Sequence, residues 1–183
     1  HMHDTGTILE FLRQNLLPKE LILEFRTSGS AKLAFEARMT AIINAQDLDQ
    51  QVVLKGGMPK GDWIEAMRTS QVGLVMQKEG AEKVVFPSKT YSILMAGQAV
   101  LAIATPNSEL GRLVEETNCG WVVAPGDLKG LLTAMQDMGI PDRLHHKRQC
   151  AFEAGHSRFD VDHLAEKWIR VINDAVGEGG RRI

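Results

Sequence analysis

Short apolar runs that alternate with helical segments constrain the fold of this chain more than any other feature of its sequence. Five runs are strand candidates, at 21–25, 52–54, 71–76, 99–104 and 120–123. Several of them are apolar throughout, without the alternation of a half-exposed strand. Continuous apolar strands separated by helices are typical of a parallel sheet that helices cover on both faces. The sequence therefore predicts an α/β fold with a Rossmann-like, doubly wound parallel sheet.

After residue 127 the pattern is helical only. Three helices are expected, at 128–138, 141–154 and 161–176, and the glycine-rich end, 177–183, is expected to fray. The last helix places its apolar residues on one face, and we interpret Trp63, Trp121 and Trp168 as core residues. With 183 residues, the chain has the length of a single domain, 1–183.

Composition excludes several classes of function. The 21 Lys and Arg residues nearly balance 23 Asp and Glu residues, for a net charge of −2, which argues against a nucleic-acid partner. Cys119 and Cys150 fit neither a disulfide framework nor a zinc pattern, so reduced, cytoplasmic residence is expected. No Cys/His cluster indicates a metal. The longest mostly apolar run, Ser92 to Ala104, is too short to span a bilayer.

The segment Phe86-Pro87-Ser88-Lys89-Thr90-Tyr91 carries the strongest signal for a binding site. Pro87 biases Phe86 toward an extended conformation, and Ser88 is a suitable N-cap for the helix that follows. The N–H groups of Lys89 and Thr90 would then point out of the helix start beside a lysine, which together make a phosphate cradle. A plain helix cap with a solvated lysine is the alternative.

A second, weaker candidate for a phosphate-binding helix start is the segment Ser28-Gly29-Ser30-Ala31-Lys32. It also follows a predicted strand and begins a predicted helix. It lacks the full G-x-G-x-x-G spacing, which disfavours a dehydrogenase-type dinucleotide site. A simple turn is the alternative.

Acidic residues near the predicted strand ends are further candidates. Glu79 and Glu82 lie in the loop before the Pro-Ser-Lys segment, where either can accept hydrogen bonds from ligand hydroxyls. A solvated, mixed-charge loop is the alternative. Glu109 stands at another helix start, where favourable interaction with the helix dipole requires no ligand.

The segment 86–91, followed by Ala96–Ala102, resembles the C-terminal half of GT-B glycosyltransferases. It is most similar to the retaining group called family 4, in members that carry Pro-Ser-Lys at this helix start. The similarity continues through 107–110, 115–123 and 125–127, and upstream through 53–56 and 71–75. It covers essentially the whole chain, and its specificity comes from the order and spacing of the pieces.

The resemblance implies that this domain binds a nucleoside-diphosphate sugar, with no metal and no other cofactor. A separate N-terminal Rossmann domain would hold the acceptor, a glycan or lipid-linked sugar. His3-Asp4 is similar to the His-Asp of the loop after the domain's first strand. We therefore expect that strand, its glycine-rich turn and the N-terminal domain to be absent from a truncated chain, which alone would not catalyse transfer. A cytoplasmic enzyme of surface polysaccharide assembly is implied, placed at the inner membrane face through the absent domain.

The implied reaction transfers the sugar to an acceptor hydroxyl with retained anomeric configuration. Lys89 and the neighbouring N–H groups would stabilise the leaving diphosphate, and Glu82 would contact the donor sugar, so these two are the candidate catalytic residues. The backbone of Gly56, Gly57 and Met58 would face the base. The expected donor-binding residues are these three together with Ser28, Gly29, Ser30, Lys32, Pro87, Ser88, Thr90, Ser92 and Glu109.

One departure from the family concerns its pair of glutamates, eight positions apart. Val84 and Ser92 stand at those positions in this chain. Ser92 is a poorer partner for ribose hydroxyls than a carboxylate, so the contacts to the donor remain open. Two other functions are alternatives: a GT-B-shaped sugar-nucleotide epimerase and a non-catalytic Rossmann-like nucleotide-binding module. The lack of histidines or additional carboxylates at the strand ends disfavours the epimerase.

Overall fold

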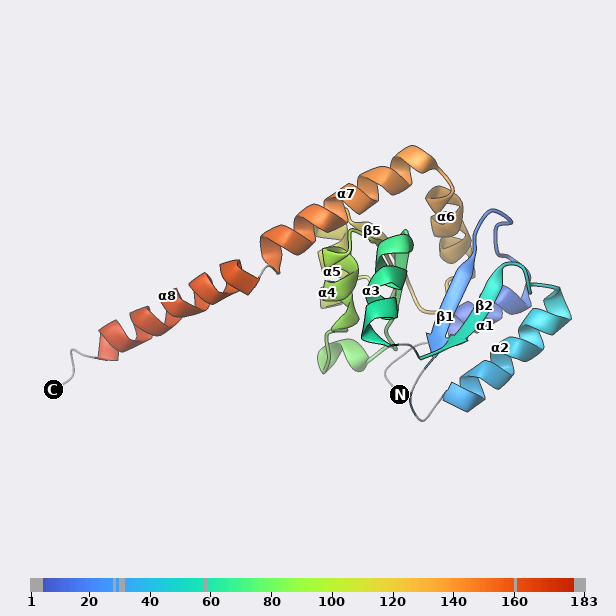
Figure 1. The fold of residues 1–183 in the computed structure, drawn as a ribbon, viewed down its shortest axis with the longest axis horizontal. Helices are drawn as coiled ribbons and strands as arrows, with labels where there is room; N and C mark the ends of the chain where they lie inside the picture. Colours follow the sequence, from blue (N-terminus) through green and yellow to red (C-terminus); the bar gives the residue numbers. More distant parts are fainter. Residues whose placement is uncertain (1–4, 28, 30–31, 58, 160, 180–183) are drawn as a thin grey trace.

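The computed structural model describes residues 5–27, 29, 32–57, 59–159 and 161–179 (Figure 1). The strands are β1 (Leu23–Thr27), β2 (Val52–Gly56), β3 (Val72–Met76), β4 (Ala99–Ile103) and β5 (Gly120–Val123). The helices are α1 (Gly6–Arg13), α2 (Lys32–Gln46), α3 (Lys60–Thr69), the 3-10 helix η1 (Ala81–Lys83), α4 (Lys89–Met95), α5 (Glu109–Glu116), α6 (Leu128–Met138), α7 (Pro141–Arg158) and α8 (Val161–Gly179). The predicted alternation of strands and helices is confirmed. β1 begins two residues later than predicted, because the Leu21 N–H donates to the Pro18 carbonyl in a turn.

The strands form two parallel sheets. β1 pairs with β2, with Leu23 opposite Val52 and Thr27 opposite Gly56. β4 lies between β3 and β5 and pairs in parallel with both. Among the described residues no ladder joins β1 to β3, so the continuous sheet that we expected is divided between these two strands. The parallel pairing itself is confirmed.

Alternate residues of β4 face two different hydrophobic cores. Leu101 and Ile103 lie in one core with buried residues of α1, α2 and α6, whereas Val100 and Ala102 lie in a second with residues of α4, α5 and α7. Successive side chains of a strand point to opposite faces, so helices cover both faces of this sheet, as predicted. All five residues of β4 are buried. Phe25 of β1 belongs to the first core, which therefore connects the two sheets.

Two glycines allow α4 to lie close to its neighbours. A Cβ atom at Gly73 of β3 would lie 2.5 Å from the side chain of Ile93 in α4. A Cβ at Gly155 of α7 would lie 2.8 Å from the carbonyl carbon of Leu94, also in α4. Ile93 and Leu94 are buried. Because α4 is packed between β3 and α7 in this way, the core sets the position of this helix, which begins at Lys89.

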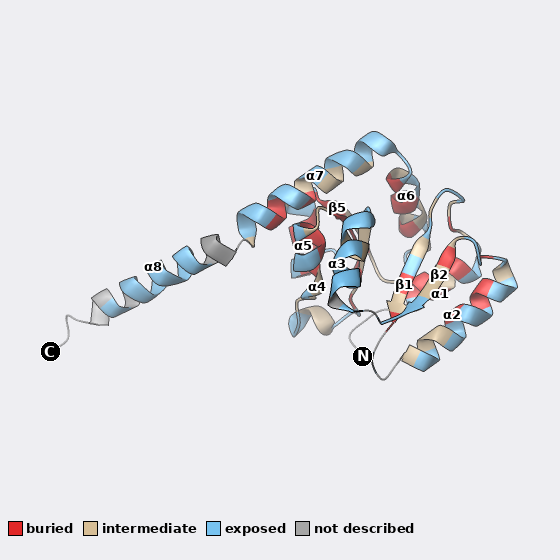
Figure 2. Cartoon of the chain, in the orientation of Figure 1, coloured by how far each residue is buried: buried red, intermediate tan, exposed pale blue. Residues whose placement is uncertain are grey.

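The last helix, α8, extends away from the rest of the molecule, and the described side chains along it are exposed (Figures 1 and 2). Trp168 is 65% exposed, so its prediction as a core residue is wrong; Trp63, 41% exposed, is not a core residue either. Trp121 packs partly buried against the first core. Helical periodicity correctly predicted an apolar face on α8, but periodicity does not determine what covers that face. None of the described helices is long and apolar enough to cross a membrane.

Candidate functional site

The carboxyl ends of β1 and β2 bring together several of the predicted residues. Lys32 begins α2, its N–H donates to the Gly29 carbonyl at 3.3 Å, and Gly29 has a left-handed φ of +84°. A Cβ atom at Gly56 would lie 3.6 Å from the Lys32 Nζ atom. Gly57 is exposed directly after β2. The structure thus places Gly29, Lys32, Gly56 and Gly57 in one region, whereas Ser28, Ser30 and Met58 lie outside the described residues.

An acidic residue that the sequence analysis did not select also occupies this region. Glu36 lies one turn along α2, with its Oε1 atom 3.8 Å from the Lys32 Nζ atom. The same oxygen accepts a hydrogen bond from the Thr27 hydroxyl at the end of β1. The spacing of Lys32 and Glu36, i and i+4 on a helix, is the signal that would have identified this pair. Lys32 therefore already has an anionic partner.

The segment 86–91 follows the path predicted for it only in part. Pro87 and Ser88 precede α4, which begins at Lys89, but Ser88 does not cap the helix through its side chain. Its backbone is helical, with φ −59° and ψ −26°, whereas a capping residue is normally extended so that its oxygen reaches the first turn. The Thr90 N–H donates to the Pro87 carbonyl at 3.0 Å, so it does not point outward as predicted. The phosphate cradle is reduced to the N–H groups of Ser88 and Lys89, which bond to no acceptor among the described residues.

Lys89 combines partial burial of its side chain with the lack of an ion-pair partner among the described residues. Its side chain is half-buried, and burial lowers the pKa of Lys89 below the usual value for a lysine. None of the ion pairs found among the described residues includes it. Burial of a cation without a partner is unfavourable, and such groups are concentrated at functional sites. An anionic ligand would supply the missing partner.

Gln77, which the sequence analysis did not select, closes the loop that leads to Lys89. It directly follows β3, is 5% exposed, and its Nε2 atom donates to the Val85 carbonyl at 2.8 Å. The half-buried Glu82 lies within that loop, on η1. Gln77 Oε1 and the hydroxyl of the fully buried Thr90 have no hydrogen-bond partner among the described residues. Any contact of Thr90 with a ligand would therefore require the loop to move.

The two remaining predicted residues lie on the surface. Ser92 is exposed on α4, one turn after Ser88. Glu109 is exposed in the first turn of α5, directly after Ser108, whose side chain caps that helix by accepting from the Gly111 N–H at 3.0 Å. This position is explained by the helix dipole alone. The role of Ser92 and Glu109 in binding stays a prediction.

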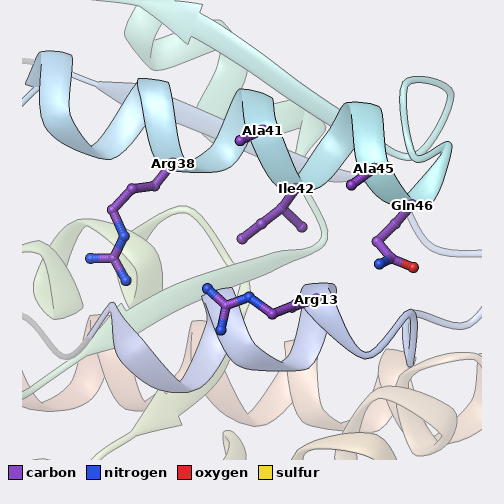
Figure 3. Close-up of a pocket in the computed structure, with 6 residues that line it drawn as sticks. All are labelled: Arg13, Arg38, Ala41, Ile42, Ala45 and Gln46. Carbon is purple, nitrogen blue, oxygen red and sulfur yellow. The ribbon is translucent and has the colours of Figure 1, made fainter.

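Two shallow hollows lie elsewhere on the described surface. One, of about 360 Å³, lies between α1 and α2, where Arg13 and Arg38 extend beside Ile42 (Figure 3). The other, of about 340 Å³, lies between the start of α1 and the turn at Pro125-Gly126. The Gly126 N–H in this turn donates to the Thr7 hydroxyl at 2.8 Å, which joins the start of α1 to the carboxyl end of β5. Neither hollow includes Lys89.

Comparison with known sequences gives one partial match. No model of a known protein family matches the chain. A stretch of 72 residues is 31% identical to a probable glycosyltransferase of Pseudomonas aeruginosa, WbjE, and covers 39% of this chain and 18% of that protein.

Solved structures with the same fold cover far more of the chain. The match to sucrose-phosphate synthase from Thermosynechococcus elongatus covers 97% of this chain and 43% of the synthase chain, with a TM-score of 0.72 and 18% identity. S. aureus TarM, in a complex that includes UDP, matches 94% of this chain and 33% of its own, with a TM-score of 0.70 and 14% identity. WaaG, a glycosyltransferase of lipopolysaccharide biosynthesis, matches 86% and 40%, with a TM-score of 0.63 and 17% identity.

These three neighbours confirm, at the level of the fold, the predicted resemblance to the C-terminal half of GT-B glycosyltransferases. The fold of the chain is that of one Rossmann-like half of a GT-B glycosyltransferase. The chain spans less than half the length of each of these neighbours.

Proposed function

We propose that the chain is the donor-binding half of a retaining glycosyltransferase and holds a nucleoside-diphosphate sugar at the carboxyl ends of its strands. Ligands of open parallel sheets bind at that edge, where the Lys89 segment and the region around Lys32 both lie. The similarity to WbjE, a probable glycosyltransferase, and to the glycosyltransferase WaaG, together with the UDP in the TarM complex, supports this assignment. The acceptor, a glycan or lipid-linked sugar, would bind to a second domain.

One observation carries the proposal. Lys89 is a half-buried cation at the start of α4 with no acidic partner among the described residues, and burial lowers its pKa. A diphosphate that bound there would accept hydrogen bonds from the Lys89 ammonium and from the N–H groups of Ser88 and Lys89. Charge-assisted hydrogen bonds of this kind are about twice as strong as neutral ones.

The implied chemistry follows from where negative charge develops. When the bond between the anomeric carbon and the diphosphate breaks, the leaving group gains negative charge on the bridging oxygen. A preorganised cation and preorganised N–H groups stabilise that charge more than they stabilise the bound donor, which lowers the barrier. We assign this role to Lys89, with no metal ion, and assign to Glu82 a contact with the hydroxyls of the donor sugar.

Titration calorimetry with UDP and with GDP tests the proposal on the chain as it stands. Lys89→Met should weaken binding of the preferred nucleotide about tenfold or more, which corresponds to the loss of a charge-assisted hydrogen bond. Lys83→Met is the matched control, because Lys83 is an exposed lysine on the neighbouring η1 and should leave affinity unchanged. Equal affinity of the wild type and Lys89→Met would reject Lys89 as a phosphate ligand.

A further inference from the structure

A row of three aromatic rings joins the Lys89 segment to the end of α7. Phe86 precedes Pro87, and its ring centroid lies 5.2 Å from that of Tyr91. The Tyr91 ring in turn meets the edge of Phe159 at 4.7 Å, with an interplanar angle of 65°. Both distances are within the range of favourable aromatic pairs. The residues on either side of Pro87, Ser88 and Lys89 are thus held by one row of rings, and Phe159 stands at its end.

Phe159 has a fixed position of its own. It is the C-cap residue directly after α7, and its N–H donates to the Gly155 carbonyl at 3.0 Å. At Gly155 the backbone of α7 lies so close to that of α4 that a Cβ atom would be 2.8 Å from the carbonyl carbon of Leu94. Phe159 is therefore anchored through α7, whereas the segment 84–88 has no regular secondary structure of its own.

Two of the three rings also pack against the second core, because Phe86 and Phe159 lie against the buried cluster that includes Ile93 and Leu94 of α4. Ile93 and Leu94 are buried, whereas Tyr91 is 38% exposed and Phe86 and Phe159 are half-buried. A ring at a partly exposed position contributes less to folding than a core residue of the same size, because less of its area leaves water on folding. In addition to this packing, Tyr91 contacts both of the other rings, so the three rings connect the residues on the two sides of the Pro87–Lys89 segment with Phe159.

We propose that Phe159 is a positioning residue for Lys89: through Tyr91 and Phe86 it fixes the path of the Pro87–Lys89 segment, so that the ammonium group and the adjacent N–H groups face a bound nucleoside diphosphate. The part of this inference that concerns the ligand rests on the proposed function. The part that concerns Lys89 itself does not. α8 begins two residues after Phe159, so the direction in which α8 leaves the domain is linked to the same row.

Three variants separate positioning from packing. Phe159→Leu keeps an apolar side chain and removes the ring, and Phe159→Tyr keeps the ring and should behave as the wild type. Phe152→Leu is the matched control, because Phe152 lies on the same helix, is 50% exposed, and stacks on His156 rather than on Tyr91. Thermal unfolding of each variant confirms that it is folded.

Two measurements report on the row without any nucleotide. Tyr91 is the single tyrosine of the chain, so protein labelled with 3-fluorotyrosine gives one fluorine resonance from this position. Competitive acetylation over a series of pH values, read by peptide mass spectrometry, gives the pH midpoint of Lys89 reactivity with the exposed Lys78 as internal reference. Phe159→Leu should shift the resonance and raise the Lys89 midpoint toward the usual value for a lysine, because a released lysine is better hydrated.

The third measurement is nucleotide affinity. Phe159→Leu should weaken binding of UDP or GDP about fivefold, the equivalent of one aromatic pair, while Phe159→Tyr and Phe152→Leu bind as the wild type does. An unchanged Lys89 midpoint or an unchanged Tyr91 resonance in Phe159→Leu would overturn the inference, even if affinity fell. If the wild type binds neither nucleotide, the proposed function fails, and the Lys89 midpoint alone decides whether Phe159 positions it.

Discussion

The contact between α7 and α4 makes a specific prediction for the substitution Gly155→Ala. The added Cβ would lie 2.8 Å from the carbonyl carbon of Leu94, 2.9 Å from its oxygen and 3.0 Å from the Met95 nitrogen. Ordinary contacts of this kind begin at about 3.5 Å, so the helices must separate by roughly half an ångström. All three obstructing atoms belong to the backbone of α4, so no side-chain rotation can relieve the overlap.

The size of the effect is the difference between two opposing contributions. Overpacking costs roughly 1–3 kcal/mol, and we take the upper end because the obstruction is backbone. Alanine stabilises a helix by about 1 kcal/mol relative to glycine, which offsets part of that cost. The net loss in the free energy of unfolding is about 2 kcal/mol, which lowers the melting temperature of a chain this long by about 4–8 °C.

Urea unfolding followed by circular dichroism measures the effect, and Gly61→Ala is the matched control. Gly61 also lies in a helix, α3, but a Cβ there meets nothing within 4 Å. Gly61→Ala should therefore leave the midpoint unchanged or raise it by the equivalent of up to about 1 kcal/mol. If Gly155→Ala unfolds at the same urea concentration as the wild type, or at a higher one, then α7 and α4 do not approach as described.

Three further predictions concern charge and exposure. Burial lowers the pKa of Lys89, so the unfolded chain binds the proton of this ammonium group more tightly than the folded chain does. The contribution of Lys89 to the free energy of unfolding therefore rises with pH between the lowered pKa and the usual value of 10.5. In urea unfolding, Lys89→Met should be more stable than the wild type at neutral pH, and this gain should shrink at alkaline pH. Burial alone would raise the pKa of Asp137, but hydrogen bonds from Trp121 and Arg143 lower it, so Asp137→Asn should cost about 1 kcal/mol at pH 7 in the same assay. The difference should shrink as the pH falls below the usual value of 3.8 and vanish only below the lowered pKa of Asp137. Trp168→Ser should change the free energy of unfolding by less than about 0.5 kcal/mol, and a larger loss in the same assay would mean that this side chain is covered.

The elements of the fold follow from local patterns, and the sequence predicted them well. The apolar run at 99–104 becomes the fully buried β4, because a strand covered on both faces has no polar side. Ser108 and Asp127, which are residue types that favour helix N-caps, cap α5 and α6 by accepting hydrogen bonds from the N–H groups of Gly111 and Gly130. In each of these cases the signal lies within a few residues of the structure it predicts.

The parts of the site that depend on long-range packing were not predictable in the same way. Ser88 has the residue type and position of a cap, but its backbone conformation, which the chain around it imposes, prevents the bond. The contact of Tyr91 with Phe159 joins residues far apart in sequence and has no periodic signature. Lys89 was identified by its motif, whereas its burial and its lack of an acidic partner required the folded chain.

The division between β1 and β3 has a consequence for how this domain associates. Among the described residues, β1 forms a ladder only with β2 and β3 only with β4, and the two strands border the same apolar interior. The edge of a strand that lies outside a ladder templates the addition of extended chain. An extended segment with apolar residues on both of its faces would therefore find partners for its backbone and cover for its side chains in the middle of the layer, between β1 and β3, rather than at the outer rim formed by β2 and β5.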